Sequence, residues 1–228
     1  MKTLFKAIAV ASLATATAAQ AELSASVAVD SEYVFRGVTL DSDATTSATL
    51  EYAISGLTVG AWIADDEAGE TDLYVSYGLN AGGVDLGVSY TDYSYNNDPL
   101  LDEEELPGVR ASGGQQEIAV SASVKGLGLS YTDGTDDTYG TDNDYSVVTL
   151  DYTFGNVNVL VGQIDVDLSN ADNSYFEISG SLGQIAGVEA TLSYSGTFDE
   201  GTNSIAVNDE GAVESDSIVI GFSKAFDL

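Results

Sequence analysis

The sequence predicts an all-β fold, a transmembrane antiparallel up-and-down β-barrel of about twelve strands. Three observations lead to this prediction. Apolar and polar residues alternate with a period of two in about twelve runs, and no amphipathic helix of useful length follows residue 21. The connections between the runs alternate between short Gly-rich turns and longer polar segments, which is typical of a membrane barrel.

The first 21 residues have the composition of a Sec signal peptide. Lys2 and Lys6 precede a short core of small apolar residues, and Ala19-Gln20-Ala21 forms a cleavage pattern. A membrane-spanning helix is the alternative, but the apolar core is too short for one and too rich in Ala and Thr. We therefore expect cleavage after Ala21 and a barrel domain over residues 22–228.

The composition excludes several classes of function. The formal net charge is −31, and removing the two lysines of the signal leaves four Lys and Arg against 37 Asp and Glu, or about −33. Nucleic acid is not an expected partner, because phosphates need a basic face. The chain has no Cys and no His, so it lacks the commonest general base and the commonest transition-metal ligand. We expect no catalytic site, no cofactor and no metal site.

Each run places apolar side chains on one face and small or charged side chains on the other. The run over residues 25–36 is treated as one strand, with Tyr33 and Phe35 on the apolar face and Asp30, Glu32 and Arg36 on the polar face. Runs of about nine to twelve residues have the length that a tilted strand needs to cross a bilayer.

The connections are sorted by length. Short turns are expected at Ser55-Gly56, Ala81-Gly82-Gly83, Lys125-Gly126, Gly155-Asn156 and Gly183–Gly187. Longer acidic segments follow the other runs, at residues 41–46, 65–70, 95–113, 133–143 and 199–215. This arrangement predicts short periplasmic turns, long acidic extracellular loops and both termini on the periplasmic side. The alternative is a soluble secreted β-sandwich, which has no reason to sort its loops by length.

The polar faces should line a lumen. The hypothesised pore-lining residues are Asp30, Glu32, Arg36, Glu51, Asp72, Asp85, Glu117, Asp151, Glu177 and Glu189. Carboxylates in excess inside a polar tube favour cations over anions. Arg36 is expected to pair with a carboxylate on an adjacent strand, with Glu51 as the candidate, and either to pin the wall or to shape a constriction.

Aromatic residues near the run ends suggest girdles at the membrane interfaces. The expected members are Tyr33, Phe35, Tyr52, Tyr90, Tyr131, Tyr152, Phe154, Phe222 and Phe226, whereas Trp62 and Tyr74 should point inward. The acidic loops raise the alternative of calcium sites, but none has the register of a known calcium loop. We interpret them as solvated charge, with weak divalent-cation bridging to lipopolysaccharide as an intermediate hypothesis.

The stretch Ser31–Thr39, "SEYVFRGVT", resembles the N-terminal signature of the TorF porin family, a group of Gram-negative outer-membrane β-barrel proteins. The aromatic-ended terminal stretch "GFSKAFDL" also resembles the last strand of such barrels. Thr39-Leu40 stands where the family has Ser-Gln, and the family's Pro- and Gln-rich segment is absent. The resemblance implies an outer-membrane barrel that acts as a porin, and it does not supply a solute.

Together these inferences predict a passive channel for small hydrophilic solutes with a cation preference. One alternative is a non-conducting barrel, plugged by the long third loop, with a structural or surface-interaction role. A barrel protease or phospholipase is disfavoured because such chemistry generally relies on a His. The oligomeric state, the solute and the pore radius are left open.

Overall fold

The computed structural model describes residues 21–66, 69–95, 114–136, 143–167, 173–198 and 216–228. Residues 1–20 of the expected signal peptide and most of the expected long loops lie outside this part. The barrel strands are β1 (Glu22–Asp30), β4 (Thr45–Ile54), β5 (Leu57–Asp65), β6 (Glu70–Ala81), β7 (Val84–Tyr95), β8 (Gly114–Val124), β9 (Leu127–Asp136), β10 (Asn143–Phe154), β11 (Val157–Val166), β12 (Asn173–Ile185), β13 (Val188–Thr197) and β14 (Asp216–Asp227).

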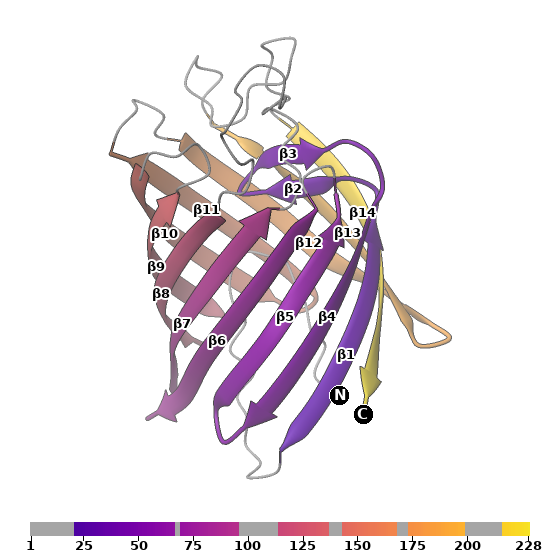
Figure 1. Cartoon of the computed structure of the whole chain (residues 1–228), viewed down its shortest axis with the longest axis horizontal. Coiled ribbons are helices and arrows are strands. Elements are labelled where there is room, and N and C mark those ends of the chain that lie inside the picture. The colour runs from indigo at the N-terminus through magenta and orange to yellow at the C-terminus, as the bar shows by residue number, and fades with distance from the viewer. Residues whose placement is uncertain (1–20, 67–68, 96–113, 137–142, 168–172, 199–215) are drawn as a thin grey trace, which may run out of the picture.

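These twelve strands form a closed antiparallel barrel (Figure 1). Each strand pairs with its neighbours along the chain, and β1 closes the sheet by pairing with both β4 and β14. The prediction of an all-β barrel with twelve strands is confirmed. In the described part of the chain no helix has the length and apolar character needed to span a membrane.

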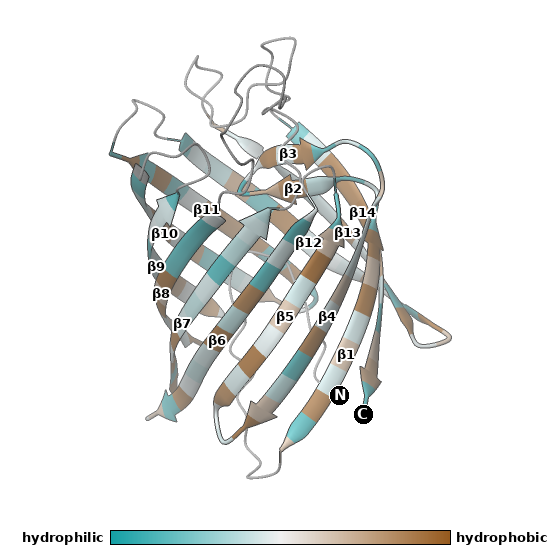
Figure 2. Ribbon diagram, viewed as in Figure 1, coloured by the Kyte–Doolittle hydropathy of each residue, from teal (hydrophilic) through white to brown (hydrophobic). Residues whose placement is uncertain are grey.

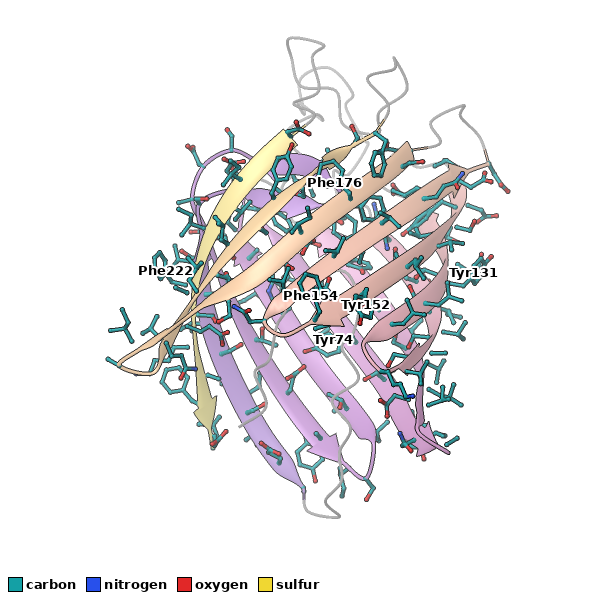
Figure 3. The ribbon with its side chains drawn as sticks, turned by 180° about the vertical axis from the view of Figure 1, so that it is seen from behind. Tyr74, Tyr131, Tyr152, Phe154, Phe176 and Phe222 are labelled. Carbon is teal, nitrogen blue, oxygen red and sulfur yellow. The ribbon has the colours of Figure 1, made fainter. Side chains whose placement is uncertain are left out.

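The outer surface of the barrel is apolar, as the alternation predicts. Large apolar side chains stand exposed on the outward positions, including Leu50 at 50% and Ile118 at 56% exposure (Figures 2 and 3). Phe176 lies 5.3 Å from the ring of Tyr194 and 5.2 Å from that of Phe198. A water-soluble barrel would bury such a band, so this surface is suited to contact with lipid.

The turns at one end of the barrel are tight and mostly of one type. Ser55-Gly56 has φ angles of 50° and 87°, and Lys125-Gly126 has 52° and 86°. Two successive positive φ angles define the type I′ turn, whose twist matches that of a β-hairpin. The turn expected over residues 183–187 is narrower than predicted. β12 continues to Ile185 past an irregular register at Gly183, and Ala186-Gly187 make the turn.

The prediction of one strand over residues 25–36 is wrong. The wall strand β1 ends at Asp30, and the chain then forms a separate two-stranded sheet of β2 (Tyr33–Phe35) and β3 (Val38–Asp41). Arg36-Gly37 joins these strands with φ angles of 51° and 79°, the same turn geometry as at the short-turn end. We call Tyr33–Asp41 the lumen hairpin, because it lies within the barrel near the end with the long connections (Figure 1).

Tyrosine rings lie across glycines on the inner wall in three places. Tyr74 on β6 covers Gly60 on β5, and Tyr145 on β10 covers Gly134 on β9. Tyr175 on β12 covers a third glycine on β11 in the same way. A Cβ at any of these glycines would overlap the ring, so the missing side chain is what lets each tyrosine lie flat along the wall.

We predict that Gly60→Ala destabilises the barrel by about 1–3 kcal/mol, because the new methyl group displaces the Tyr74 ring. The measurement is the urea midpoint of the folded band on a gel run without heating. Gly180→Ala is the matched control, since a Cβ there would come no closer than 3.3 Å to any neighbour. Equal midpoints for the two variants would contradict the prediction.

Candidate functional site

The aromatic face of the lumen hairpin packs against the inner wall. Tyr33 is 6% exposed, donates a hydrogen bond of 2.7 Å to Glu70 Oε2 on β6, and lies 5.8 Å from the Trp62 ring on β5. The ring of Phe35 meets Tyr93 on β7 edge-on at 6.2 Å. The expectation that Tyr33 and Phe35 belong to a lipid-facing girdle is wrong, because their apolar face meets the barrel wall from inside.

Arg36, at the tip of the lumen hairpin, forms a buried ion pair with Glu117 on β8. The Nη2 to Oε1 distance is 2.6 Å, and the side chains are 7% and 8% exposed. The hydroxyls of Tyr93 and Tyr145 donate further hydrogen bonds to Glu117, at 3.0 and 2.7 Å. Burial acts to lower the pKa of Arg36, but the charge of Glu117 raises it and the net pKa lies above its usual value. Arg36 is therefore fully charged.

Glu51, the candidate partner for Arg36, has a different contact. It accepts a hydrogen bond of 2.7 Å from the hydroxyl of Tyr74. The two carboxylates share one geometry, since each lies opposite a glycine on the next strand and is reached by the tyrosine that covers that glycine. At the Glu117 site, Tyr93 donates a second hydrogen bond and the lumen hairpin brings an arginine.

The other side of the lumen hairpin touches the opposite wall. The hydroxyls of Thr39 and Ser217 on β14 are 2.5 Å apart. A Cβ at Gly37 would lie 2.7 Å from Tyr175 Cβ and 2.6 Å from the carbonyl oxygen of Gly196, so only glycine fits this place. The lumen hairpin thus reaches from β14 and the β12–β13 wall across to β8.

The remaining carboxylates of the expected set also lie on inward positions of the wall or in the lumen. Asp72 and Glu189 are buried, at 4% and 8% exposure. Asp85 accepts a hydrogen bond of 2.8 Å from Asn80 near the short-turn end, and Asp151 accepts one of 3.4 Å from Asn158. None of these four touches the lumen hairpin through a hydrogen bond or an ion pair found among the described residues.

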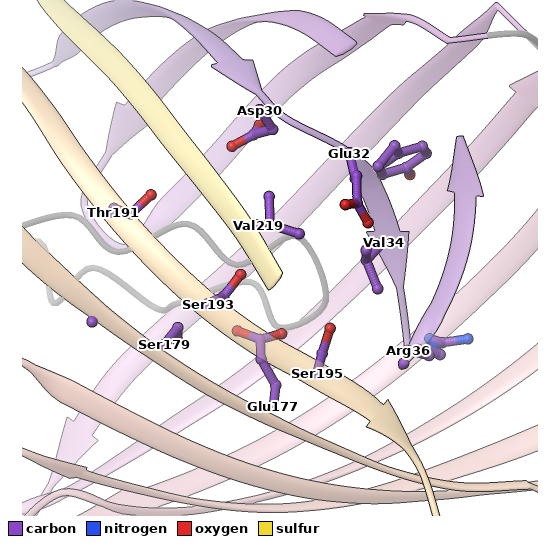
Figure 4. Close-up of a pocket in the computed structure, with 13 residues that line it drawn as sticks. Asp30, Glu32, Val34, Arg36, Glu177, Ser179, Thr191, Ser193, Ser195 and Val219 are labelled. Carbon is purple, nitrogen blue, oxygen red and sulfur yellow. The ribbon is translucent and has the colours of Figure 1, made fainter. Parts of the chain in front are cut away.

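Asp30, Glu32 and Glu177 line a cavity beside the lumen hairpin (Figure 4). It lies between the hairpin and the β12–β14 wall and has about 790 Å³ of empty volume, part of it open to solvent. Its other lining residues include four hydroxyl side chains, namely Ser179, Thr191, Ser193 and Ser195. Three carboxylates and four small hydroxyls give this cavity a polar, acidic side, beside the apolar side chains of Val34 and Val219.

The inner wall over β10–β12, next to the cavity, carries an apolar cluster that the sequence reasoning missed. Its buried members are Tyr145, Val147, Leu160, Ile164, Val166 and Tyr175 on β10, β11 and β12. The expectation that inward positions are small and polar is therefore wrong for this sector. The sequence of β11 could have indicated this cluster, because its apolar residues are not confined to one face of the strand. Among the described residues no group of three or more His, Cys, Asp or Glu side chains is arranged to hold a metal ion.

Comparison with known proteins finds similarity at the level of fold. No family model and no curated protein matches the chain, whereas 82 chains of solved structures do. The KdgM porin in complex with disordered oligogalacturonate is 8% identical with a TM-score of 0.51, covering 90% of this chain and 99% of that one. CdiB from Acinetobacter baumannii is 13% identical with a TM-score of 0.46, covering 91% and 60%.

OccK2 (OpdF) from Pseudomonas aeruginosa is 14% identical with a TM-score of 0.40, covering 82% of this chain. The chain spans about 60% of the length of that structure. At these identities the similarity is one of architecture. The match to KdgM, which spans nearly all of both chains, supports a closed β-barrel as the fold of this protein.

We predict that Tyr33→Phe lowers the free energy of unfolding by about 1–3 kcal/mol, because Glu70 loses a buried hydrogen-bond donor. The measurement is urea unfolding in lipid vesicles, followed by the fluorescence of Trp62, the single tryptophan of the chain. Tyr77→Phe is the control, since that tyrosine is 46% exposed on the outer face. A loss of stability no larger than that of the control would show that the Tyr33 hydroxyl is dispensable.

Proposed function

We propose that this protein is an outer-membrane porin, a passive diffusion channel for small hydrophilic solutes that prefers cations. The observation that carries the proposal is the uncompensated charge of the cavity. Asp30, Glu32 and Glu177 line it, while Arg36, which also borders it, is already neutralised by Glu117.

The distribution of cations along the chain strengthens this reasoning. Arg36, Lys125 and Lys224 are the three Lys and Arg residues in the part of the chain that the structure describes. Lys125 lies in a tight turn, and Lys224 lies near the ring of Phe226, which is exposed on the outer face. Neither is placed to neutralise the cavity carboxylates. Unpaired carboxylates in a narrow polar path raise the local concentration of cations and repel anions.

The cation preference sets this chain apart from a channel for acidic sugars. The KdgM structure contains oligogalacturonate, a polyanion. Three carboxylates around the open cavity of this chain would repel such a ligand, so the shared fold does not imply a shared solute.

The proposal also includes a cellular location and a family resemblance. We infer export by a signal peptide cleaved after Ala21 and insertion into the outer membrane of a Gram-negative bacterium, with the short turns on the periplasmic side. The stretch that resembles the TorF family, Ser31–Thr39, contains most of the lumen hairpin. Its Tyr, Phe, Arg and Gly residues make the contacts that hold the hairpin in the lumen. Bridging of the acidic loops to lipopolysaccharide by divalent cations stays a prediction.

A non-conducting barrel is the second candidate, and a specific observation favours it. The lumen hairpin and the apolar cluster both occupy the cross-section of the barrel. The plugging element would then be this hairpin rather than the third loop, whose residues 96–113 lie outside the described part. Single-channel recording from the refolded chain without residues 1–21 separates the candidates, because stable conductance steps require an open path.

We predict a cation-selective reversal potential under a salt gradient, and a smaller one for Glu177→Gln. A carboxylate about 6 Å from the ion path contributes roughly 0.7 kcal/mol in water, attractive for a cation and repulsive for an anion, so its loss should lower the cation-to-anion permeability ratio by up to about tenfold. Asp165→Asn is the matched control, because that carboxylate is exposed at an outward position of β11. An anion-selective wild type would overturn the cation preference.

A further inference from the structure

The lumen hairpin is attached to the barrel almost entirely through side chains. β2 and β3 form a sheet of their own that is not part of the barrel sheet. Just before them, the Ser31 amide donates to the Ile220 carbonyl and the Ser31 hydroxyl accepts from the Ile220 amide, both at 3.0 Å. A two-stranded sheet with strands of three and four residues is not stable by itself in water. Its position therefore depends on what its side chains contact.

The contact at the tip of the lumen hairpin differs in kind from the others. Tyr33 and Phe35 pack against rings and one carboxylate, and Thr39 meets a single hydroxyl. Arg36 and Glu117 instead join two full charges, both more than nine-tenths buried. A buried charge without its partner is strongly unfavourable, so each residue of the pair requires the other to be present.

Hydrogen bonds from the barrel wall fix the orientation of the Glu117 carboxylate. Tyr93 and Tyr145, from the strands β7 and β10, direct their hydroxyls at its two carboxylate oxygens. Tyr145 can reach β8 because Gly134 on the intervening strand has no side chain. The carboxylate is thus fixed on the wall opposite Ser217, the residue that Thr39 touches.

We propose that Glu117 is a positioning residue that holds the lumen hairpin across the barrel through Arg36 and thereby sets the width of the conducting path. This inference rests on the proposed channel function. With the pair intact, the hairpin covers the β5–β8 wall and leaves the cavity along β12–β14 as the path. Without it, the tip leaves the wall and the cross-section opens.

The first experiment compares Glu117→Gln with Glu177→Gln in planar bilayers. Both variants remove one lumen carboxylate, but only Glu117→Gln leaves Arg36 without a charged partner. We expect Glu117→Gln to raise the unit conductance about twofold or more, since a sheet layer roughly 10 Å thick is released from the cross-section. Glu177→Gln should lower the cation-to-anion permeability ratio but show no such rise in conductance, because its Arg36–Glu117 pair still holds the hairpin. Equal conductance for the two variants would overturn the proposal.

A reversible disulfide tests whether movement of the hairpin causes the change. The chain has no cysteine, and the side chains of Thr39 and Ser217 meet at 2.5 Å, so T39C/S217C is placed to bridge the hairpin to β14. Introduced into Glu117→Gln, the oxidised bridge should return conductance toward the wild-type value, and a reductant should raise it again. Conductance that does not respond to the bridge would contradict the role of the hairpin.

The fluorescence of Trp62 tests the positioning role of Glu117 separately from the proposed channel function, because it does not require the barrel to conduct. Trp62 is the single tryptophan and lies 5.8 Å from Tyr33, so displacement of the hairpin exposes it. We expect acrylamide to quench Trp62 more strongly in Glu117→Gln than in wild type or Glu177→Gln, and the oxidised bridge to reverse this. If the wild type gives no current in bilayers while Glu117→Gln conducts and shows this quenching, the positioning role of Glu117 is supported and the proposal of an open channel fails. Unchanged quenching of Trp62 in a folded Glu117→Gln variant would refute the positioning role of Glu117.

Discussion

The buried ion pair between Arg36 and Glu117 is the constraint on which the interior of this barrel depends. Two charges removed from water are costly, and hydrogen bonds to their remaining polar atoms reduce that cost. Tyr93 and Tyr145 supply such hydrogen bonds to the carboxylate. Tyr145 in turn needs Gly134, because any side chain there would occupy the space of its ring. A carboxylate on β8, a glycine on β9 and a tyrosine on β10 therefore act together. They place a fixed anion opposite the tip of the hairpin.

Much of the wall could be predicted from the sequence, because its physical cause is local. A strand between lipid and lumen must alternate, and the alternation assigns a face to residues such as Leu50, Glu51 and Ile118 without knowledge of their partners. The tight turns were also predictable, since successive positive φ angles favour glycine. The same signal marks the lumen hairpin. Arg36-Gly37 has the X-Gly form of Ser55-Gly56, and taking it as a turn would have divided the first run correctly.

The partners of the hairpin could not be predicted, because they depend on closure of the barrel. Arg36 and Glu117 are 81 residues apart, and the strands of the lumen hairpin never pair with β8. Reasoning from neighbouring strands favoured Glu51, which instead accepts from Tyr74. Tyr33 and Phe35 do share one face of β2, but period-two alternation does not say what an apolar face touches. Lipid outside a barrel and aromatic side chains inside it satisfy Tyr33 equally well.

The division of the lumen into a filled half and an open half follows from the two faces of the hairpin. Its aromatic face packs against β5–β7, and Arg36 at the tip adds a contact with β8 through the ion pair. The opposite face, with Glu32 and Val34, borders the cavity. An apolar tip in place of Arg36 would hold the hairpin but leave Glu117 buried and unpaired. An arginine left free there would instead offset the carboxylates of the cavity. Pairing Arg36 with a carboxylate outside the cavity lets one cation position the hairpin without forming an ion pair with Asp30, Glu32 or Glu177.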